Sequence, residues 1–100
     1  MTRDAARRYI IAYDVPDDRR RLQLAKKLGS YGDRVQYSVF IVDVRPAKLV
    51  RLRSELMRLV NPSADSVLLC EIGPLGSGLE NRFEIIGRPR PVTGNDALVF

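Results

Sequence analysis

Apolar residues alternate along this chain between short runs typical of strands and longer stretches with the spacing of amphipathic helices. The first run, YIIAYDV, is rich in β-branched and aromatic residues and ends before Pro16, so we expect a buried strand there. The run RVQYSVFIVDV is long for one strand, and it predicts either two short strands or one strand bent at a bulge near Ser38. The strand-like runs occupy residues 9–15, 34–44, 65–73 and 82–87.

The first helix is expected directly after Pro16. Asp17 or Asp18 supplies its N-cap, it continues to about Tyr31, and Gly32 follows in the position where glycine commonly ends a helix. Its predicted inner stripe, which would pack on a sheet, comprises Leu24, Ala25, Leu28 and Tyr31.

The second helix is expected to begin at Pro46, because proline is favoured at the first helical position, and to continue to about Val60. Asn61-Pro62 then stops it. Leucines recur along it at spacings of three, four and three, which is the apolar face of an amphipathic helix. These residues are Leu49, Leu52, Leu56 and Leu59.

The order of these elements predicts the fold class. Strand, helix, one or two strands, helix, strand and a further strand fit an α+β sandwich of the ferredoxin-like βαββαβ type with an additional C-terminal strand. Residues 1–87 are expected to form this single domain. Residues 88–100 form a tail broken by Pro and Gly, whose apolar end ALVF can pair with a partner subunit.

The length of the chain and its first residues bear on its oligomeric state and on its cellular location. One hundred residues with 45% apolar content bury only a modest core, which dimerisation can complete. No window reaches the roughly 18–20 consecutive apolar residues of a membrane span. The polar start MTRDAARR lacks the apolar stretch of a secretory signal. We therefore expect a cytoplasmic protein.

The ionisable residues restrict the chemistry. Seventeen Lys and Arg against twelve Asp and Glu give a formal charge of +5, which indicates nucleic acid as a partner or, alternatively, an Arg-rich solvated surface. The chain has no histidine, so Ser-His and Cys-His dyads are excluded, and carboxylates with Mg²⁺ or Mn²⁺ suit the inventory better than zinc. Cys70 is the sole cysteine, so no intrachain disulfide forms.

Asp14 ends the otherwise apolar first strand, where a carboxylate contributes nothing to packing. In one interpretation it binds a hard divalent cation that holds a phosphodiester and its attacking water. In the other it forms an Asx turn or an early cap before Pro16. One carboxylate is a poor metal site, but two copies of Asp14 in a two-fold dimer can share one ion.

Arg19, Arg20 and Arg21 follow at the start of the first helix. They fan around the helix, so they cannot all face one ligand, although Arg21 can lean back towards Asp14. Cations at a helix N-terminus oppose the helix dipole, which favours an anionic partner.

A second basic group lies near one face of the second helix. It forms either a phosphate-tracking stripe or a solvated face in which Arg51 pairs with Glu55 four residues later. Its members are Lys48, Arg51 and Arg58.

With these residues in view, the chain resembles the family of CRISPR-associated protein two over about residues 8–87. The motifs that carry the resemblance are Tyr13-Asp14, Asp-Asp-Arg at 17–19 with Arg21, GDRVQYSVF at 32–40, and Asp65-Ser66-Val67.

The resemblance implies a ferredoxin-like homodimer with a divalent metal at its two-fold axis, bound through Asp14. It also implies a metal-dependent endonuclease, acting on single-stranded RNA or double-stranded DNA, that works with the CRISPR integrase in spacer acquisition.

The resemblance further implies which residues surround this site. Arg21 and Arg34 would neutralise the scissile phosphate, and Ser38 would hydrogen-bond a metal-bound water. Gln23 is a departure, since some relatives carry arginine there. The residues matched to the site are Tyr13, Asp14, Arg21, Arg34, Ser38 and Phe40, of which Phe40 packs rather than reacts.

Two other functions remain open. The chain can be a non-catalytic scaffold that holds duplex DNA on its arginines and bridges integrase dimers. It can also be an unrelated ferredoxin-like RNA binder, which would need paired aromatics exposed on central strands. Tyr37 and Phe40 are three residues apart and would point to opposite faces of a regular strand, which argues against the RNA binder.

Overall fold

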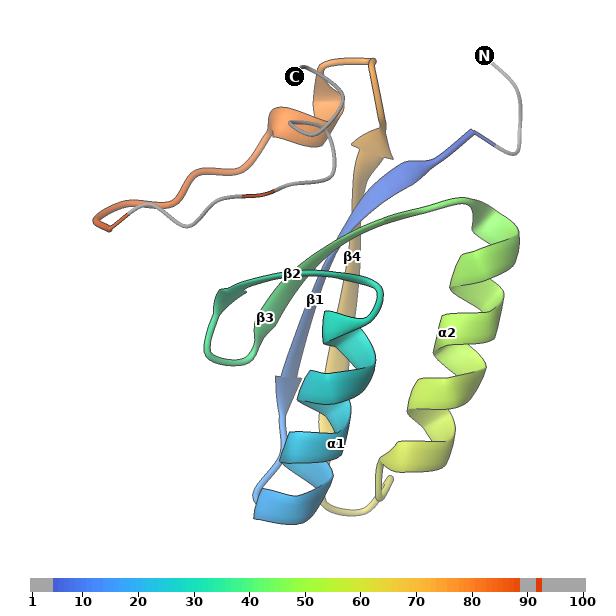
Figure 1. Ribbon diagram of the computed structural model, residues 1–100, viewed down its shortest axis with the longest axis vertical. Helices are drawn as coiled ribbons and strands as arrows, with labels where there is room; N and C mark the ends of the chain where they lie inside the picture. Colours follow the sequence, from blue (N-terminus) through green and yellow to red (C-terminus); the bar gives the residue numbers. More distant parts are fainter. Residues whose placement is uncertain (1–4, 89–91, 93–100) are drawn as a thin grey trace.

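The computed structural model describes residues 5–88 and 92, and its four strands form one antiparallel sheet in the order β2-β3-β1-β4. Both helices cover the same face of this sheet (Figure 1). This order and layering confirm the ferredoxin-like α+β fold. The elements are β1 (Arg7–Asp14), α1 (Asp18–Gly29), β2 (Gly32–Gln36), β3 (Val39–Val44), α2 (Pro46–Leu59), β4 (Ser66–Pro74) and a 3₁₀ turn, η1 (Leu79–Asn81).

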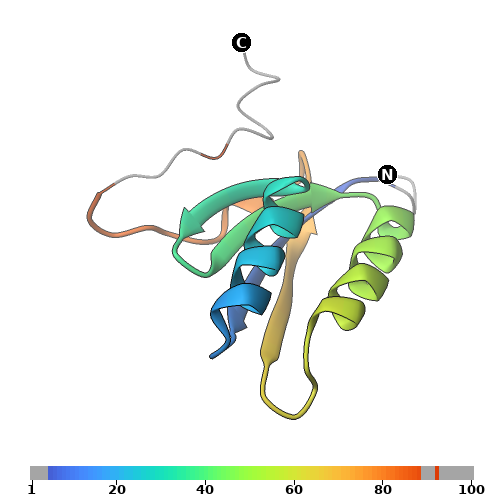
Figure 2. The same cartoon turned by 60° about the horizontal axis from the view of Figure 1, so that its bottom comes forward.

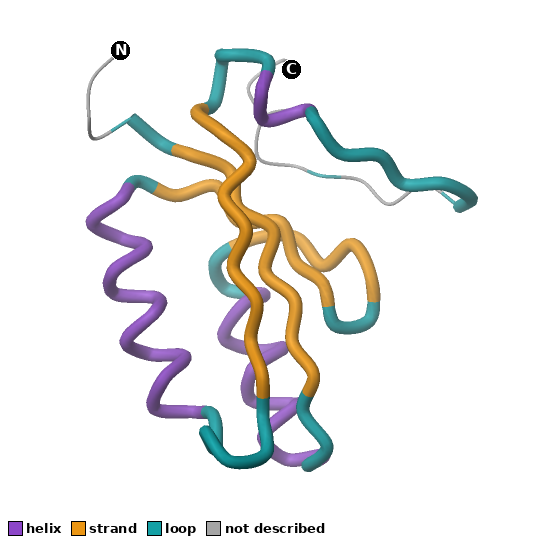
Figure 3. Tube along the Cα trace, turned by 180° about the vertical axis from the view of Figure 1, so that it is seen from behind, coloured by secondary structure: helices purple, strands orange, loops and turns teal. Residues whose placement is uncertain are grey.

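Alternation along β1 gives the central strand two different faces. Its odd-numbered residues from Tyr9 onwards are buried in the core under the helices, whereas Ile10, Ala12 and Asp14 point to the face without helices. Figure 3 shows this second face from behind the molecule. The core beneath the helices contains Tyr9, Ile11, Tyr13, Val15, Leu24, Leu28, Phe40, Val42, Val44, Leu52 and Leu56.

The helices follow the predicted stripes. Leu24 and Leu28 of α1 are fully buried, and Ala25 and Tyr31 pack partly against them. In α2, Leu52 and Leu56 are buried, and the two outer leucines of the predicted face are half-buried. The periodicity of apolar residues therefore predicted both helix faces correctly.

The run at 34–44 forms two strands rather than one bent strand. Tyr37 and Ser38 make the turn between β2 and β3. A shift in register falls between Arg34 and Gln36, so the irregularity lies just before the turn and not at Ser38. The turn brings the hairpin back beside the end of β1, where the backbone N–H of Tyr13 donates to the carbonyl of Ser38 at 3.1 Å.

Gly32 does not close the first helix, contrary to the sequence prediction. The helix ends at Gly29 with Ser30 as its C-cap, and Gly32 is the first residue of β2. A Cβ at position 32 would lie 2.1 Å from the carbonyl oxygen of Ile41. Glycine is needed there because β2 approaches β3 closely, a contact between distant residues that local sequence does not show.

The predicted strand at 82–87, which was the additional C-terminal strand of the expected fold, is absent from the described residues. Phe83 and Ile85 are half-buried and Ile86 is 88% exposed, so the apolar alternation is present. The segment extends after η1 towards the β2–β3 side of the molecule and pairs with no strand (Figure 2). A strand needs a hydrogen-bonded neighbour, which this segment lacks in the described part of the chain. The apolar end ALVF lies outside the described residues.

Neither helix of the described residues combines the length and the apolar character that crossing a bilayer requires.

Candidate functional site

Asp14 lies exposed at the end of β1, on the sheet face without helices. On one side its register partner is Ser66 of β4, and on the other lies the turn between β2 and β3. Among the described residues, no hydrogen bond or ion pair holds its carboxylate. The cap alternative is wrong, because Asp17 caps α1 and its carboxylate accepts from the backbone N–H of Arg20 at 2.9 Å.

Tyr37, in the turn beside Asp14, contacts several of the other predicted site residues. Its carbonyl oxygen accepts from Arg34 Nε at 2.9 Å and from the Tyr13 hydroxyl at 3.5 Å. A hydrogen bond to the Tyr37 side chain is the main cause that raises the pKa of Arg21, and Asp18 adds to it. Arg21 also donates to the carbonyl of Val15 at 2.8 Å. The turn at Tyr37 therefore gathers side chains from β1, α1 and β2.

Sequence reasoning missed this role of Tyr37, although the residue belongs to the motif that carried the resemblance. Ser38, a turn-prone residue between two β-prone runs, was the available indication of the turn, whereas tyrosine itself favours strands. The contacts themselves depend on how α1 and β1 pack beside the turn, which no local pattern reports.

The aromatic residues of the site support it rather than react. Tyr13 and Phe40 are 5% and 1% exposed, and their rings stack with centroids 6.3 Å apart. The guanidinium of Arg34 lies 5.1 Å from the Tyr37 ring centroid and 5.6 Å from that of Phe40. Because Tyr37 lies in a turn, the strand-alternation argument against an RNA-recognition motif does not apply. The burial of Phe40 argues against that motif instead.

The three arginines at the start of α1 have different environments. Arg20 makes a bidentate pair with Asp65, at 2.7 and 3.0 Å, which raises the pKa of Arg20 and lowers that of Asp65. Arg19 is exposed without an ion-pair partner among the described residues. Of these three, Arg21 bonds the end of β1 through the Val15 carbonyl, and Arg20 contributes to the structure of the domain.

Glu55 does not pair with Arg51 as the solvated-face alternative supposed. Its carboxylate accepts from the Tyr31 hydroxyl at 2.6 Å and from Lys27 Nζ at 3.4 Å, so it joins α2 to α1. The hydrogen bond from Tyr31 is the main cause that lowers the pKa of Glu55. Lys48 Nζ lies 5.4 Å from the centroid of the Tyr31 ring.

Within the described residues, Arg51 and Arg58 are exposed and form no ion pair. The predicted basic stripe of α2 is therefore available to an anion. Because α2 covers one face of the sheet and Asp14 points to the other, the stripe is a second surface rather than part of the same site.

No group of three or more Cys, Asp or Glu side chains within the described residues could hold a metal ion. Asp14 alone remains as a ligand, and an exposed carboxylate without a partner suits a hard cation. The donor set of a single copy is too small, so the residues fit a metal only if a second chain contributes to the site.

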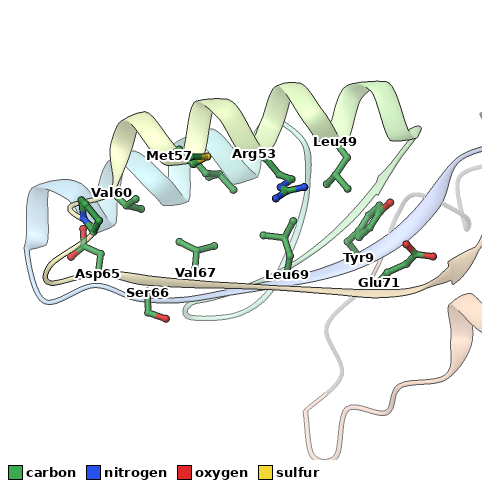
Figure 4. A pocket seen from close by; sticks show the side chains of 12 residues that line it. Tyr9, Leu49, Arg53, Met57, Val60, Asp65, Ser66, Val67, Leu69 and Glu71 are labelled. Atoms are coloured by element: carbon green, nitrogen blue, oxygen red, sulfur yellow. The ribbon is translucent and has the colours of Figure 1, made fainter.

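A separate hollow of about 690 Å³ lies between α2 and the edge strand β4 (Figure 4). Its walls are mostly apolar, with Leu49 and Met57 above Val67 and Leu69, and Arg53 among them. None of the predicted site residues lines it, so we do not place the chemistry there.

The structure thus defines a ferredoxin-like domain with one free carboxylate at the tip of its central strand, beside a turn held by arginines. A family model described as CRISPR associated protein Cas2 matches residues 7–74. This chain belongs to that family.

Two curated relatives show how far the similarity extends. The CRISPR-associated endoribonuclease Cas2 4 of Rhodospirillum rubrum is 50% identical over 60 residues, which is 60% of this chain and 48% of that protein. The CRISPR-associated endoribonuclease Cas2 3 of a Synechocystis species is 40% identical over 85% of this chain and 88% of its own length.

Solved structures agree with the fold. The crystal structure of Streptococcus pyogenes Cas2 superposes with a TM-score of 0.68 at 30% identity, over 80% of this chain and 99% of that one. A chain of a partial Cas6-RT-Cas1–Cas2 complex superposes with a TM-score of 0.60 at 26% identity, over 80% of this chain and 90% of that one.

Proposed function

We propose that this chain is a metal-dependent endonuclease subunit of CRISPR spacer acquisition, which acts in the cytoplasm on single-stranded RNA or double-stranded DNA. The observation that carries the proposal is the free, exposed carboxylate of Asp14 beside the turn that Arg34 holds, with Arg21 bonded to the Val15 carbonyl at the end of β1. The names of the Rhodospirillum and Synechocystis relatives, both endoribonucleases, support the reaction class.

The catalytic form is a homodimer built on the sheet face without helices. Leu68 on this face is 61% exposed, and Cys70 beside it is also exposed. An apolar sheet face of this kind is stabilised when a second copy covers it. A two-fold axis near the end of β1 would bring the two copies of Asp14 together, which supplies the second ligand that one chain lacks.

The two Asp14 carboxylates would hold Mg²⁺ or Mn²⁺, which when bound generates the nucleophile from water and stabilises charge on the phosphate. Arg21 and Arg34 would hold the phosphate by charge-assisted hydrogen bonds. Ser38, in the turn, would position the attacking water. Tyr13 and Phe40 keep the turn in place by packing beneath it.

The test is cleavage by Asp14→Asn, with Glu84→Gln as a control that removes an exposed carboxylate elsewhere. Since the carboxylate has no partner to lose among the described residues, the variant keeps its melting temperature. Divalent-dependent cleavage of RNA and duplex DNA falls about a hundredfold or more, as expected when a metal ligand is removed. Cleavage by Asp14→Asn equal to that of the control would show that the site is wrong.

A second candidate function is the non-catalytic scaffold that holds DNA and bridges integrase dimers. It is favoured by the free cations on α2 and by the chain of similar fold in the Cas6-RT-Cas1–Cas2 complex. If it is right, Asp14→Asn leaves spacer acquisition intact. Charge reversal at Lys48, Arg51 and Arg58 instead abolishes DNA binding.

A further inference from the structure

The beginning of α2 lies at the opposite end of β1 from Asp14 (Figure 1). An open hollow of about 600 Å³ lies there, lined by the first turns of α2 and the residues around it. We infer that this hollow binds a backbone phosphate of nucleic acid, separately from the Asp14 site. The inference rests on the proposed binding of nucleic acid. The basic residues of this site differ from those of the predicted α2 stripe. Arg45 is added, and Arg58 is left out because it does not line the hollow. The lining residues on which it depends are Ala6, Asp43, Arg45, Ala47, Lys48 and Arg51.

The first argument is charge. Arg45, Lys48 and Arg51 line the hollow, and none forms an ion pair with any described residue. The one carboxylate in its wall, Asp43, is already neutralised, because Arg8 donates to both of its oxygens at 2.9 and 3.0 Å. Three uncompensated cations around one hollow make it a favourable place for an anion.

Lack of an ion pair does not by itself distinguish these cations. Among the described residues, Arg7, Arg8, Arg20, Arg21 and Lys27 each form an ion pair with a carboxylate, and other exposed cations form none. What distinguishes the basic side chains at the beginning of α2 is that three of them line one hollow. Lys48 is nevertheless held in place by its contact with the Tyr31 ring. Because its side chain is already ordered, binding an anion costs less conformational entropy.

The backbone adds to the same hollow. The N-cap of α2, Arg45, makes no side-chain cap, and no acidic residue lies in the first turn. Pro46 has no N–H, while the N–H groups of Lys48 and Leu49 both donate to the carbonyl of Arg45 at 3.0 Å. The N–H of Ala47 has no acceptor among the described residues, and Ala47 lines the hollow. It can donate to a phosphate oxygen.

The position explains why the ligand would be a nucleic-acid backbone. Eight residues of β1 separate the hollow, next to Ala6, from Asp14. At about 3.4 Å per residue this is a separation of about 27 Å. Phosphates of one DNA strand are spaced at about 3.4 Å along the helix axis, so about eight base pairs span the distance. A single duplex can therefore contact both places, whereas a free phosphate ion can occupy only one.

The test compares two variants that remove the same amount of charge. The double variant Arg45→Gln with Arg51→Gln changes the hollow. The double variant Arg53→Gln with Arg82→Gln removes two exposed arginines elsewhere that also lack ion pairs within the described residues. Affinity for a DNA duplex of about two helical turns is measured as a function of salt. We expect the first variant to bind about tenfold more weakly, with a salt slope smaller by about 0.9 for each phosphate that the protein no longer neutralises, and the control to change less than about twofold.

An NMR titration of the unmodified protein provides a second measurement that does not depend on the variants. Duplex DNA should shift the amide resonance of Ala47, and inorganic phosphate at the same concentration should not. If inorganic phosphate shifted the Ala47 resonance and duplex DNA did not, the hollow would bind small anions, and the proposal that its ligand is nucleic acid would be wrong. If both double variants bound duplex DNA more weakly by the same factor, binding would depend on net charge, and the proposed site in the hollow would be wrong. If the unmodified protein binds no duplex, this inference fails, together with the duplex-DNA part of the proposed function, whereas cleavage of single-stranded RNA tests the remaining part separately.

Discussion

The guanidinium of Arg20 donates to both carboxylate oxygens of Asp65, at 2.7 and 3.0 Å. This pair joins the first turn of α1 to the residue before β4, so it links the two segments that flank the end of β1. Asp65 also accepts from the backbone N–H of Asn61 at 2.8 Å, and its side chain is completely shielded from solvent. The base of the candidate site is therefore held by an ion pair that takes no part in the proposed chemistry.

We predict that this pair makes stability depend on pH. The hydrogen bond from Arg20 lowers the pKa of Asp65 below its ordinary 3.8 in the folded protein. A lowered folded-state pKa contributes stability above the unfolded value, and that contribution is lost as the pH falls through the folded value. The variant Asp65→Asn should therefore melt at a lower temperature than the unmodified protein at neutral pH, and the difference should disappear in acid well below 3.8.

Thermal melts across the acid range check this, with Glu84→Gln as the control that should match the unmodified protein throughout. A melting difference that stays constant into acid would show that packing around position 65, and not the ion pair, carries the effect.

We predict that Gly32→Ala destabilises the domain by about 2 kcal/mol, because the new Cβ would overlap the carbonyl oxygen of Ile41 and force β2 away from β3. Urea unfolding measures the change. Gly29→Ala is the matched control, since nothing lies within 4 Å of its Cβ. Alanine is the better helix former, so Gly29→Ala should stabilise the domain by about 0.5 kcal/mol. If the two substitutions changed stability equally, the close approach of the strands would be contradicted.

We predict that Leu68→Asp converts the homodimer to a monomer that remains folded. Leu68 is 61% exposed on the sheet face without helices, so a charge there costs a single chain little but opposes burial against a second copy. Val50→Asp, at a site 66% exposed on α2, is the control and should remain dimeric. Sedimentation velocity distinguishes the two. Dimers of Leu68→Asp would place the interface on another surface.

We predict that Arg34→Lys lowers cleavage about tenfold while the melting temperature changes little. Lysine cannot reproduce the fork that Arg34 directs at the Tyr37 carbonyl, so the turn beside Asp14 loosens. Hydrogen exchange at the Tyr13 amide, which donates to the Ser38 carbonyl, should become faster. Arg53→Lys should change neither property. Faster exchange with unchanged cleavage would show that the turn does not position the substrate.

The periodic pattern of apolar residues was enough to predict β1, β4, both helices and the face that each helix buries. These predictions succeeded because side chains two residues apart on a strand, or three or four apart on a helix, share a face for reasons internal to the element. Asp14 was identified in the same way, as a carboxylate at the end of an apolar strand. The same reasoning predicted a strand at 82–87, where the pattern is present but the hydrogen-bonded neighbour is absent from the described residues.

Contacts between residues distant in sequence were decided only by the tertiary structure. Gly32 is needed because of Ile41, Glu55 binds Tyr31 and Lys27 rather than Arg51, and Arg20 is held by Asp65. These partners are brought together by packing of the helices on the sheet, so neither spacing nor residue type could assign them. The amino-acid sequence alone determined the elements and their buried faces, because those follow from short-range geometry. The fold alone determined which cations remain free to bind an anion, because that depends on which carboxylates it places within reach.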